Sequence, residues 1–170
     1  MKKYISGFLT FLVMIGLDQW AKMLAAETLK GSGEKKILGD VFVLQYLENH
    51  GAAFGILQGK QILLAVITGI ILLAVIYLYI KTPFTRKFCI QQLMTLMLAA
   101  GAVGNMYDRI VRGYVIDFFY VKLIDFPIFN IADCYVVVAA IILAVLFGFV
   151  YSEEDLEELR YVHSKSEGKK

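Results

Sequence analysis

Long apolar runs, each with a few polar residues near its ends, dominate this chain of 170 residues. Residues 62–80 are nineteen consecutive positions without a charge, close to the ~20 that a helix needs to cross about 30 Å of hydrocarbon. Segments 88–107 and 131–151 are about as long, and their few polar residues lie mainly towards one end. We predict a membrane-spanning helix over each of these three segments.

A fourth span is predicted over residues 4–26, although this segment also has features of a secretory signal peptide. Lys2 and Lys3 precede a short apolar run and small residues, as in a cleaved leader. Asp18 and Lys22, however, interrupt the region in which a leader would approach its cleavage site. Their i, i+4 spacing places them on one helical face, where they can pair. This pairing favours a retained helix.

Four spans put both termini on one side of the membrane, and the loops 27–60 and 108–130 together on the other side. Lysines and arginines near the termini and in the link 81–89 number nine, against eight elsewhere. The totals barely differ, but short basic segments beside the spans count most, and "MKK" and "KTPFTRK" are dense. We therefore expect cytoplasmic termini, with residues 1–151 forming one membrane domain and residues 152–170 a cytoplasmic tail that begins as a short helix.

The loop 27–60 does not have the sequence pattern of a membrane-spanning helix. Val41, Val43 and Gln45 alternate with larger apolar residues, and glycines punctuate the segment, a pattern typical of short strands. Its apolar residues would let such a sheet rest on the bilayer surface. The expected fold is an all-α membrane protein of four transmembrane helices with a small extracytoplasmic β-sheet subdomain.

Composition agrees with a membrane protein and excludes one class of partner. Hydrophobic residues make up 59% of the chain and charged residues 19%, unlike an ordinary soluble domain. The net charge of +2 is small and the basic residues are dispersed, so we expect no nucleic-acid binding. Cys89 and Cys134 fall at opposite membrane faces, too far apart for a disulfide, and their spacing fits no metal motif.

Two aspartates, Asp117 and Asp133, flank the loop between the last two spans. The chain can fold back between them and bring both to one depth. Two carboxylates in one confined site cannot easily both ionise, so one keeps a proton while the other stays charged. Such a pair supplies an acid and a base, which can activate a water against a peptide carbonyl without a metal.

Two other interpretations of these acids stay open from the residues alone. Asp133 falls in the first turn of a predicted helix, where an aspartate commonly acts as a cap. A small transporter or cation-binding membrane protein is also compatible, because hard oxygen ligands for a cation are available from Asp18, Asp108, Asp117, Asn130 and Asp133.

Five short motifs together resemble the lipoprotein signal peptidases, the bacterial signal peptidase II family. They follow in that family's order, on the same plan of four helices, and the resemblance covers about residues 5–150. The motifs are "DQWAK" (18–22), "NHGAAFG" (49–55), "GAVGNMYDR" (101–109), "GYVIDF" (113–118) and "FNIAD" (129–133).

The resemblance implies an intramembrane aspartic peptidase of the bacterial cytoplasmic membrane. Such an enzyme removes the signal peptide from prolipoproteins, just before a cysteine that already carries a diacylglyceryl group, and it needs no cofactor or metal. By motif position the catalytic residues are Asp117 and Asp133, the pair that the physical argument also selects. The implied partners are the diacylglyceryl prolipoprotein and membrane lipids.

The resemblance also implies roles for other polar residues. Asn49, Asn105 and Arg109 match positions expected to line the substrate pocket, where amide donors and a fixed cation suit a developing oxyanion. Asn130 matches a position expected to hydrogen-bond near the two acids. For Arg109, contact with a phospholipid headgroup or pairing with Asp108 is an equal alternative from the residues alone.

The remaining motif residues are expected to support the structure or the substrate. Asp18, Lys22 and Asp108 are interpreted as structural support. His50 stands where the family most familiarly has arginine, and we interpret it as a variable neighbour without a catalytic role.

The first loop, including Phe54 and Gly55, is expected to close over the pocket and contact the substrate. No helical seam argues for association, so a monomer is the default.

Overall fold

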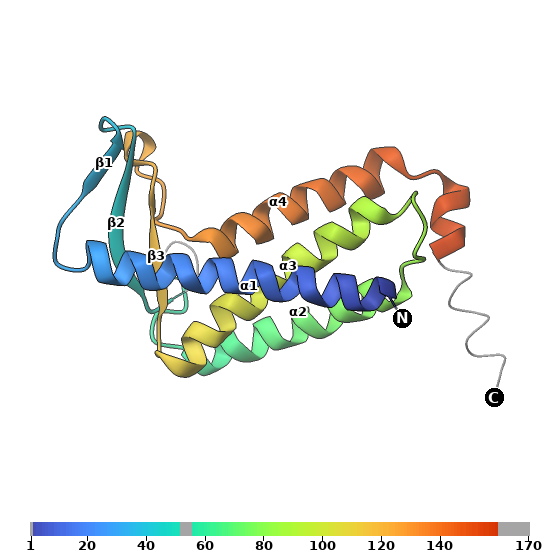
Figure 1. The fold of residues 1–170 in the computed structure, drawn as a ribbon, viewed down its shortest axis with the longest axis horizontal. Helices are drawn as coiled ribbons and strands as arrows, with labels where there is room; N and C mark the ends of the chain where they lie inside the picture. Colours follow the sequence, from blue (N-terminus) through green and yellow to red (C-terminus); the bar gives the residue numbers. More distant parts are fainter. Residues whose placement is uncertain (1, 52–55, 160–170) are drawn as a thin grey trace.

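The computed structural model describes residues 2–51 and 56–159 (Figure 1). Four helices in this part of the chain are long and apolar enough to cross a membrane. They are α1 (Lys2–Leu29), α2 (Gln61–Lys81), α3 (Cys89–Val111) and α4 (Ile131–Val145), which continues through Val150. The predicted four-helix fold with a small sheet is confirmed. Helices α1 and α3 run further than the expected spans 4–26 and 88–107.

Helix α3 is the centre of the bundle and packs against each of the other three helices. Two glycines permit the close approach. A Cβ at Gly101 would lie 2.5 Å from the carbonyl oxygen of Ala132 in α4, and a Cβ at Gly104 would lie 2.6 Å from a carboxylate oxygen of Asp18 in α1. The backbones of α3 and α4 therefore meet at Gly101, and the Asp18 side chain of α1 packs against α3 at Gly104.

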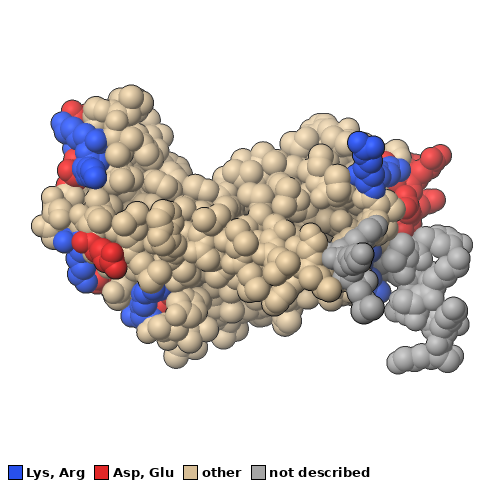
Figure 2. Space-filling view, in the orientation of Figure 1, with Lys and Arg blue, Asp and Glu red and all other residues tan. Residues whose placement is uncertain are grey.

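Charged side chains gather at the two ends of the molecule, and the middle of the visible face is without them (Figure 2). Large apolar side chains such as Ile70 and Leu73 in α2 are exposed on the outside of the bundle. Hydrocarbon is the solvent that such a band requires. The chain is therefore a multi-pass membrane protein.

A three-stranded antiparallel sheet covers one end of the bundle (Figure 1). Strands β1 (Lys35–Leu38) and β2 (Phe42–Asn49) come from the first loop, as expected. The third strand, β3 (Val115–Tyr120), comes from the loop between α3 and α4, for which we expected no strand. In the β2–β3 register, Leu47 pairs with Asp117 and Asn49 pairs with Val115.

The sheet is fixed to the bundle by a small apolar core. Ile116 and Phe118 of β3 are buried against Ala25 and Leu29 at the end of α1. Each of these side chains is at most 5% exposed. Burial of the β3 side chains on α1 therefore sets the position of the strand relative to the helices.

The opposite end of the bundle is closed by the α2–α3 link and by the last turn of α4. Leu146–Val150 forms a π-helical turn, and the backbone N–H of Tyr151 donates to the carbonyl of Leu146 at 2.9 Å. The ring of Tyr151 then meets the buried Phe88 in the link edge-on, at a centroid distance of 5.3 Å.

A short helix over residues 153–159 follows Tyr151. Ser152 and Asp155 cap its start: the N–H of Ser152 donates to Asp155 Oδ2 at 3.1 Å, and the N–H of Asp155 donates to Ser152 Oγ at 3.3 Å. Lys87 in the link forms an ion pair with Asp155. This pair fixes the short helix to the bundle.

Candidate active site

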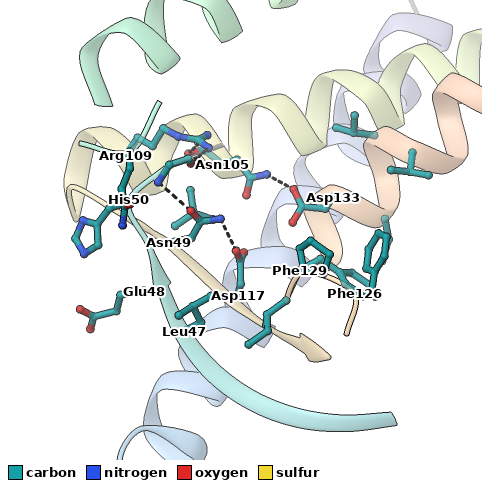
Figure 3. A pocket seen from close by; sticks show the side chains of 18 of the residues that line it. Leu47, Glu48, Asn49, His50, Asn105, Arg109, Asp117, Phe126, Phe129 and Asp133 are labelled. Atoms are coloured by element: carbon teal, nitrogen blue, oxygen red, sulfur yellow. Dashed lines mark hydrogen bonds between the residues drawn. The ribbon is translucent and has the colours of Figure 1, made fainter. Parts of the chain in front are cut away.

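Asp117 and Asp133 line one cavity of about 790 Å³ at the junction of the sheet and the bundle (Figure 3). Asp117 lies in the middle of β3, and its residue is 1% exposed. Asp133 lies in the first turn of α4. The two acids therefore come from different elements, and the docking of the sheet brings them to a common space.

Asn130 links the two acids. Its Nδ2 donates to Asp117 Oδ1 at 2.6 Å, and its Oδ1 accepts the N–H of Asp133 at 3.0 Å. Its own N–H donates to Asp133 Oδ2 at 3.0 Å. Asn130 and Asp133 thus form a capping box at the start of α4. Asp133 caps the helix and faces the cavity, so these two interpretations are compatible.

Two further amides hold the remaining carboxylate oxygens. Asn49 at the end of β2 donates from Nδ2 to Asp117 Oδ2 at 2.8 Å, and Asn105 in α3 donates to Asp133 Oδ1 at 2.8 Å. Each of the four carboxylate oxygens therefore accepts one hydrogen bond from an amide N–H. Figure 3 shows the bonds from Asn49 and Asn105. Asn49 and Asn105 both line this cavity, and their amide donors, which we expected to face substrate, here contact the acids.

The environment of Asp117 favours its protonated form. Burial, and after it the nearby charge of Asp133, raise the pKa of this carboxyl to about 7, against the lowering effect of the hydrogen bonds from Asn49 and Asn130. At neutral pH Asp117 therefore holds a proton far more often than an ordinary aspartate does. An ordinary aspartate would have lost its proton several pH units lower.

A buried charge cluster lies behind the two acids, between α1 and α3. Lys22 Nζ lies 2.9 Å from Asp18 Oδ2 and 2.8 Å from Asp108 Oδ2, and all three side chains are fully buried. The predicted Asp18–Lys22 pair is therefore present. Lys22 also donates to Asn105 Oδ1 at 2.9 Å, so the cluster connects to the amide that contacts Asp133.

Asp18 has a second contact that ties α1 to α4. Its Oδ1 accepts the backbone N–H of Ala132 at 2.9 Å, one residue before Asp133. The lysine ammonium group occupies the space between Asp18 and Asp108, where a cation would otherwise bind. Among the described residues, no group of three or more His, Cys, Asp or Glu side chains could hold a metal ion.

Two members of this cluster were missed from the sequence. Arg112 forms an ion pair with Asp108, and Gln19 Nε2 donates to Asp108 Oδ1 at 3.2 Å and to Asp18 Oδ2 at 3.1 Å. Arg112 follows Asp108 at i+4, the same spacing that indicated the Asp18–Lys22 pair. That signal could have identified Arg112; nothing in the pattern distinguishes Gln19.

Arg109 lies on the cavity wall and does not pair with Asp108, so that alternative is wrong. Its Nη1 donates to the carbonyl of Asn105 and its Nη2 to the carbonyl of Gly51, both at 3.3 Å. Its Nε is buried and has no hydrogen-bond partner among the described residues.

His50 lines the same cavity with an exposed side chain near the ring of Tyr114. Phe54 and Gly55 lie outside the described residues.

The rest of the cavity wall is largely apolar. Val136, Val137 and Val138 on α4 form one side, and Phe126 to Phe129, before α4, form another. Polar groups are concentrated around the two acids (Figure 3). A cavity of this kind suits an apolar chain with a few polar atoms at a defined position. The two cysteines are free, Cys89 at the start of α3 and Cys134 beside Asp133 on this wall.

Comparison with known proteins identifies relatives across most of the chain. A family described as "Signal peptidase (SPase) II" matches residues 10–149. The lipoprotein signal peptidase of Clostridium novyi (strain NT) is 43% identical over 132 residues, which are 76% of this chain and 88% of that protein. The lipoprotein signal peptidase of Halothermothrix orenii (strain H 168) is 40% identical over 147 residues, 86% of this chain and 96% of that protein.

Two solved structures have the same fold. A bacterial membrane enzyme determined by the in meso method at 2.3 Å resolution superposes with a TM-score of 0.73 at 32% identity, covering 84% of this chain and 87% of that one. A second, at 1.9 Å resolution, gives a TM-score of 0.72 at 31% identity, covering 86% and 94%. With the family match over more than half of its length, this chain belongs to the signal peptidase II family.

Proposed function

We propose that this membrane peptidase is an aspartic endopeptidase that removes signal peptides from diacylglyceryl-modified prolipoproteins, with Asp117 and Asp133 as its catalytic residues. The observation that carries the proposal is their shared cavity, in which Asn130 contacts both carboxylates. Relatives at 40% identity or more bear the name lipoprotein signal peptidase, which supports the substrate class.

In the proposed mechanism the two acids exchange roles around one water molecule. Asp133, as the carboxylate, takes a proton from the water, whose oxygen forms the new bond to the scissile carbonyl carbon. Asp117, which holds a proton near neutral pH, donates to the carbonyl oxygen. When the C–N bond breaks, Asp133 gives the proton taken from water to the leaving nitrogen, and Asp117 takes back a proton from a hydroxyl of the tetrahedral intermediate as the carboxyl product forms.

Binding follows from the shape of the cavity. The apolar wall formed by α4 would accept the signal helix and lipid chains, while the diacylglyceryl group keeps the scissile bond at the depth of the acids. Arg109, with its unpaired Nε, would bind a backbone carbonyl of the substrate. Asn49 and Asn105 would turn from the acids to the substrate as it enters.

The location of the site completes the proposal. The basic segments beside the spans favour cytoplasmic termini in a bacterial cell membrane, with the acids near the outer face. The peptidase domain spans residues 1–151, and residues 152–170 form the tail. A monomer is the proposed state, because no helical seam in the sequence argues for association.

The test is cleavage of a diacylated prolipoprotein by the purified protein in detergent, with EDTA present. We expect Asp117→Asn and Asp133→Asn each to lose about 10²–10⁴-fold in kcat. Asp125→Asn is the matched control, because Asp125 has φ of 49°, which asparagine tolerates, and its carboxylate accepts a hydrogen bond from the exposed Tyr120 hydroxyl, away from the two acids. Retained cleavage in either variant overturns the dyad, and loss of wild-type cleavage in EDTA favours a metal-dependent reaction.

A further inference from the structure

A second hollow, of about 390 Å³, lies at the opposite end of the bundle from the two acids. Its walls come from Ser6 and Thr10 on α1, Tyr79 on α2, and Leu93 and Leu96 on α3. None of its lining residues lines the catalytic cavity. We call this hollow the α1–α3 groove.

The groove exists because α1 and α3 diverge. The Lys22–Asp108 pair holds the two helices together near the sheet, and Figure 1 shows them separating towards the start of α1. Phe84 in the link closes the end of the space, with its ring 4.6 Å from that of Tyr4 and 5.8 Å from that of Tyr79. The groove is therefore built into the crossing of the helices.

An unpaired cation stands at the rim. Arg86 lines the groove, is exposed, and makes no hydrogen bond or ion pair with another described residue. The neighbouring Lys87 pairs with Asp155, and Lys81 lies over the ring of Tyr77 at 5.6 Å. The hydroxyl groups of Ser6, Thr10 and Thr85 line the same groove. The rim thus offers one guanidinium and several hydroxyl groups to an anion.

The other walls of the groove are apolar. Leu93, Leu96 and the Tyr79 ring are apolar, and they lie on helices whose outer faces carry an apolar surface suited to hydrocarbon. A cationic rim above an apolar channel between transmembrane helices matches the two halves of a phospholipid. A free phosphate ion has no apolar part that could pack against the apolar wall.

We propose that the α1–α3 groove binds an anionic phospholipid, with its phosphate on Arg86 and one acyl chain along Leu93 and Leu96. Charge complementarity favours a lipid of net negative charge, because the choline group of a zwitterionic lipid would bring a second cation to Arg86. This site is independent of the peptidase reaction.

Lipid retention in native mass spectrometry tests the proposal. The full chain is reconstituted in nanodiscs of equal parts phosphatidylglycerol and phosphatidylcholine, released, and scored for lipid that stays bound. We expect Arg86→Gln to retain about fivefold less phosphatidylglycerol than wild type. Lys81→Gln removes one charge from the same end of the bundle outside the groove and is the matched control. Leu93→Trp keeps the charge but fills the channel.

The expected pattern is retention of phosphatidylglycerol over phosphatidylcholine, loss in Arg86→Gln and Leu93→Trp, and wild-type retention in Lys81→Gln. Arg86 and Leu93 are exposed and Lys81 is half-buried, so none of the three substitutions disturbs the core of the bundle. Equal losses in the two charge variants, or equal retention of both lipids, would show only general surface attraction and overturn the site. Full retention of the lipid in Leu93→Trp would also overturn the site, because the acyl chain would then not need the groove. Displacement of the lipid by millimolar glycerol phosphate would overturn it as well, because the headgroup alone would then suffice for binding.

Discussion

Replacement of Lys22 by methionine tests whether the buried charge cluster holds α1 and α3 together behind the two acids. The lysine is fully buried, and its ammonium group contacts Asp18 at 2.9 Å, Asp108 at 2.8 Å and Asn105 at 2.9 Å. Methionine fills a similar volume but leaves two buried carboxylates facing each other without their shared cation. The variant therefore isolates the charge from the packing.

The expected cost is about 3–5 kcal/mol in the free energy of unfolding, the usual range for removing one partner of a buried ion pair. The other contacts of the two acids limit the loss. Asp108 keeps its ion pair with Arg112, and Asp18 keeps the N–H of Ala132. The uncompensated charge is therefore closer to one than to two.

Unfolding with sodium dodecyl sulfate in mixed micelles, followed by circular dichroism, measures this cost. The double variant Lys22→Met with Asp18→Asn should be more stable than Lys22→Met alone by at least about 1 kcal/mol, because one of the opposed charges is gone. Lys30→Met is the control, since its pair with Glu48 is exposed and exposed ion pairs contribute little to stability. If Lys22→Met lowers the free energy of unfolding no more than Lys30→Met does, the charge cluster does not hold the helices together.

Two further predictions concern the acids and the helix contact. Burial and Asp133 raise the pKa of Asp117 to about 7. Because the proposed reaction uses the proton of Asp117, kcat should fall about tenfold per pH unit above that value. A flat profile up to about pH 9 would exclude Asp117 as the acid. Gly101→Ala places a Cβ 2.5 Å from a backbone carbonyl of α4 and should cost about 1–3 kcal/mol in the same unfolding assay. Gly16→Ala, with no atom within 4 Å of its Cβ, is the helical control, and equal losses in both would contradict tight α3–α4 packing.

The four helices could be predicted because hydrocarbon thickness sets the length of an uncharged run. Their ends were less predictable. Helix α3 continues to Val111, four residues beyond the expected end, because Asp108, which looks like a polar terminus in the sequence, is paired with Lys22 inside the bundle. A charge marks the end of a span only where no partner is folded against it.

Strand β3 was not predicted because its pattern does not alternate. Val115 to Phe118 are all buried, Asp117 among them, and the partner strand β2 lies far away in the sequence. The motifs indicated which acids belong to the site. They could not indicate that Asn49, Asn105 and Asn130 point their amides at those acids, because amide orientation depends on three elements docked together.

The π-helical turn at Leu146–Val150 has a consequence for tolerance to sequence change. A turn closed by an i to i+5 hydrogen bond holds one residue more than an α-helical turn of nearly the same length. Deleting Gly148, whose Cβ position is open, would let the segment relax to ordinary α-helix while Tyr151 still reached Phe88. The last turn of α4 can thus lose a residue and still form a helix. The first turn, which carries Asp133, is ordinary α-helix and has no such extra residue.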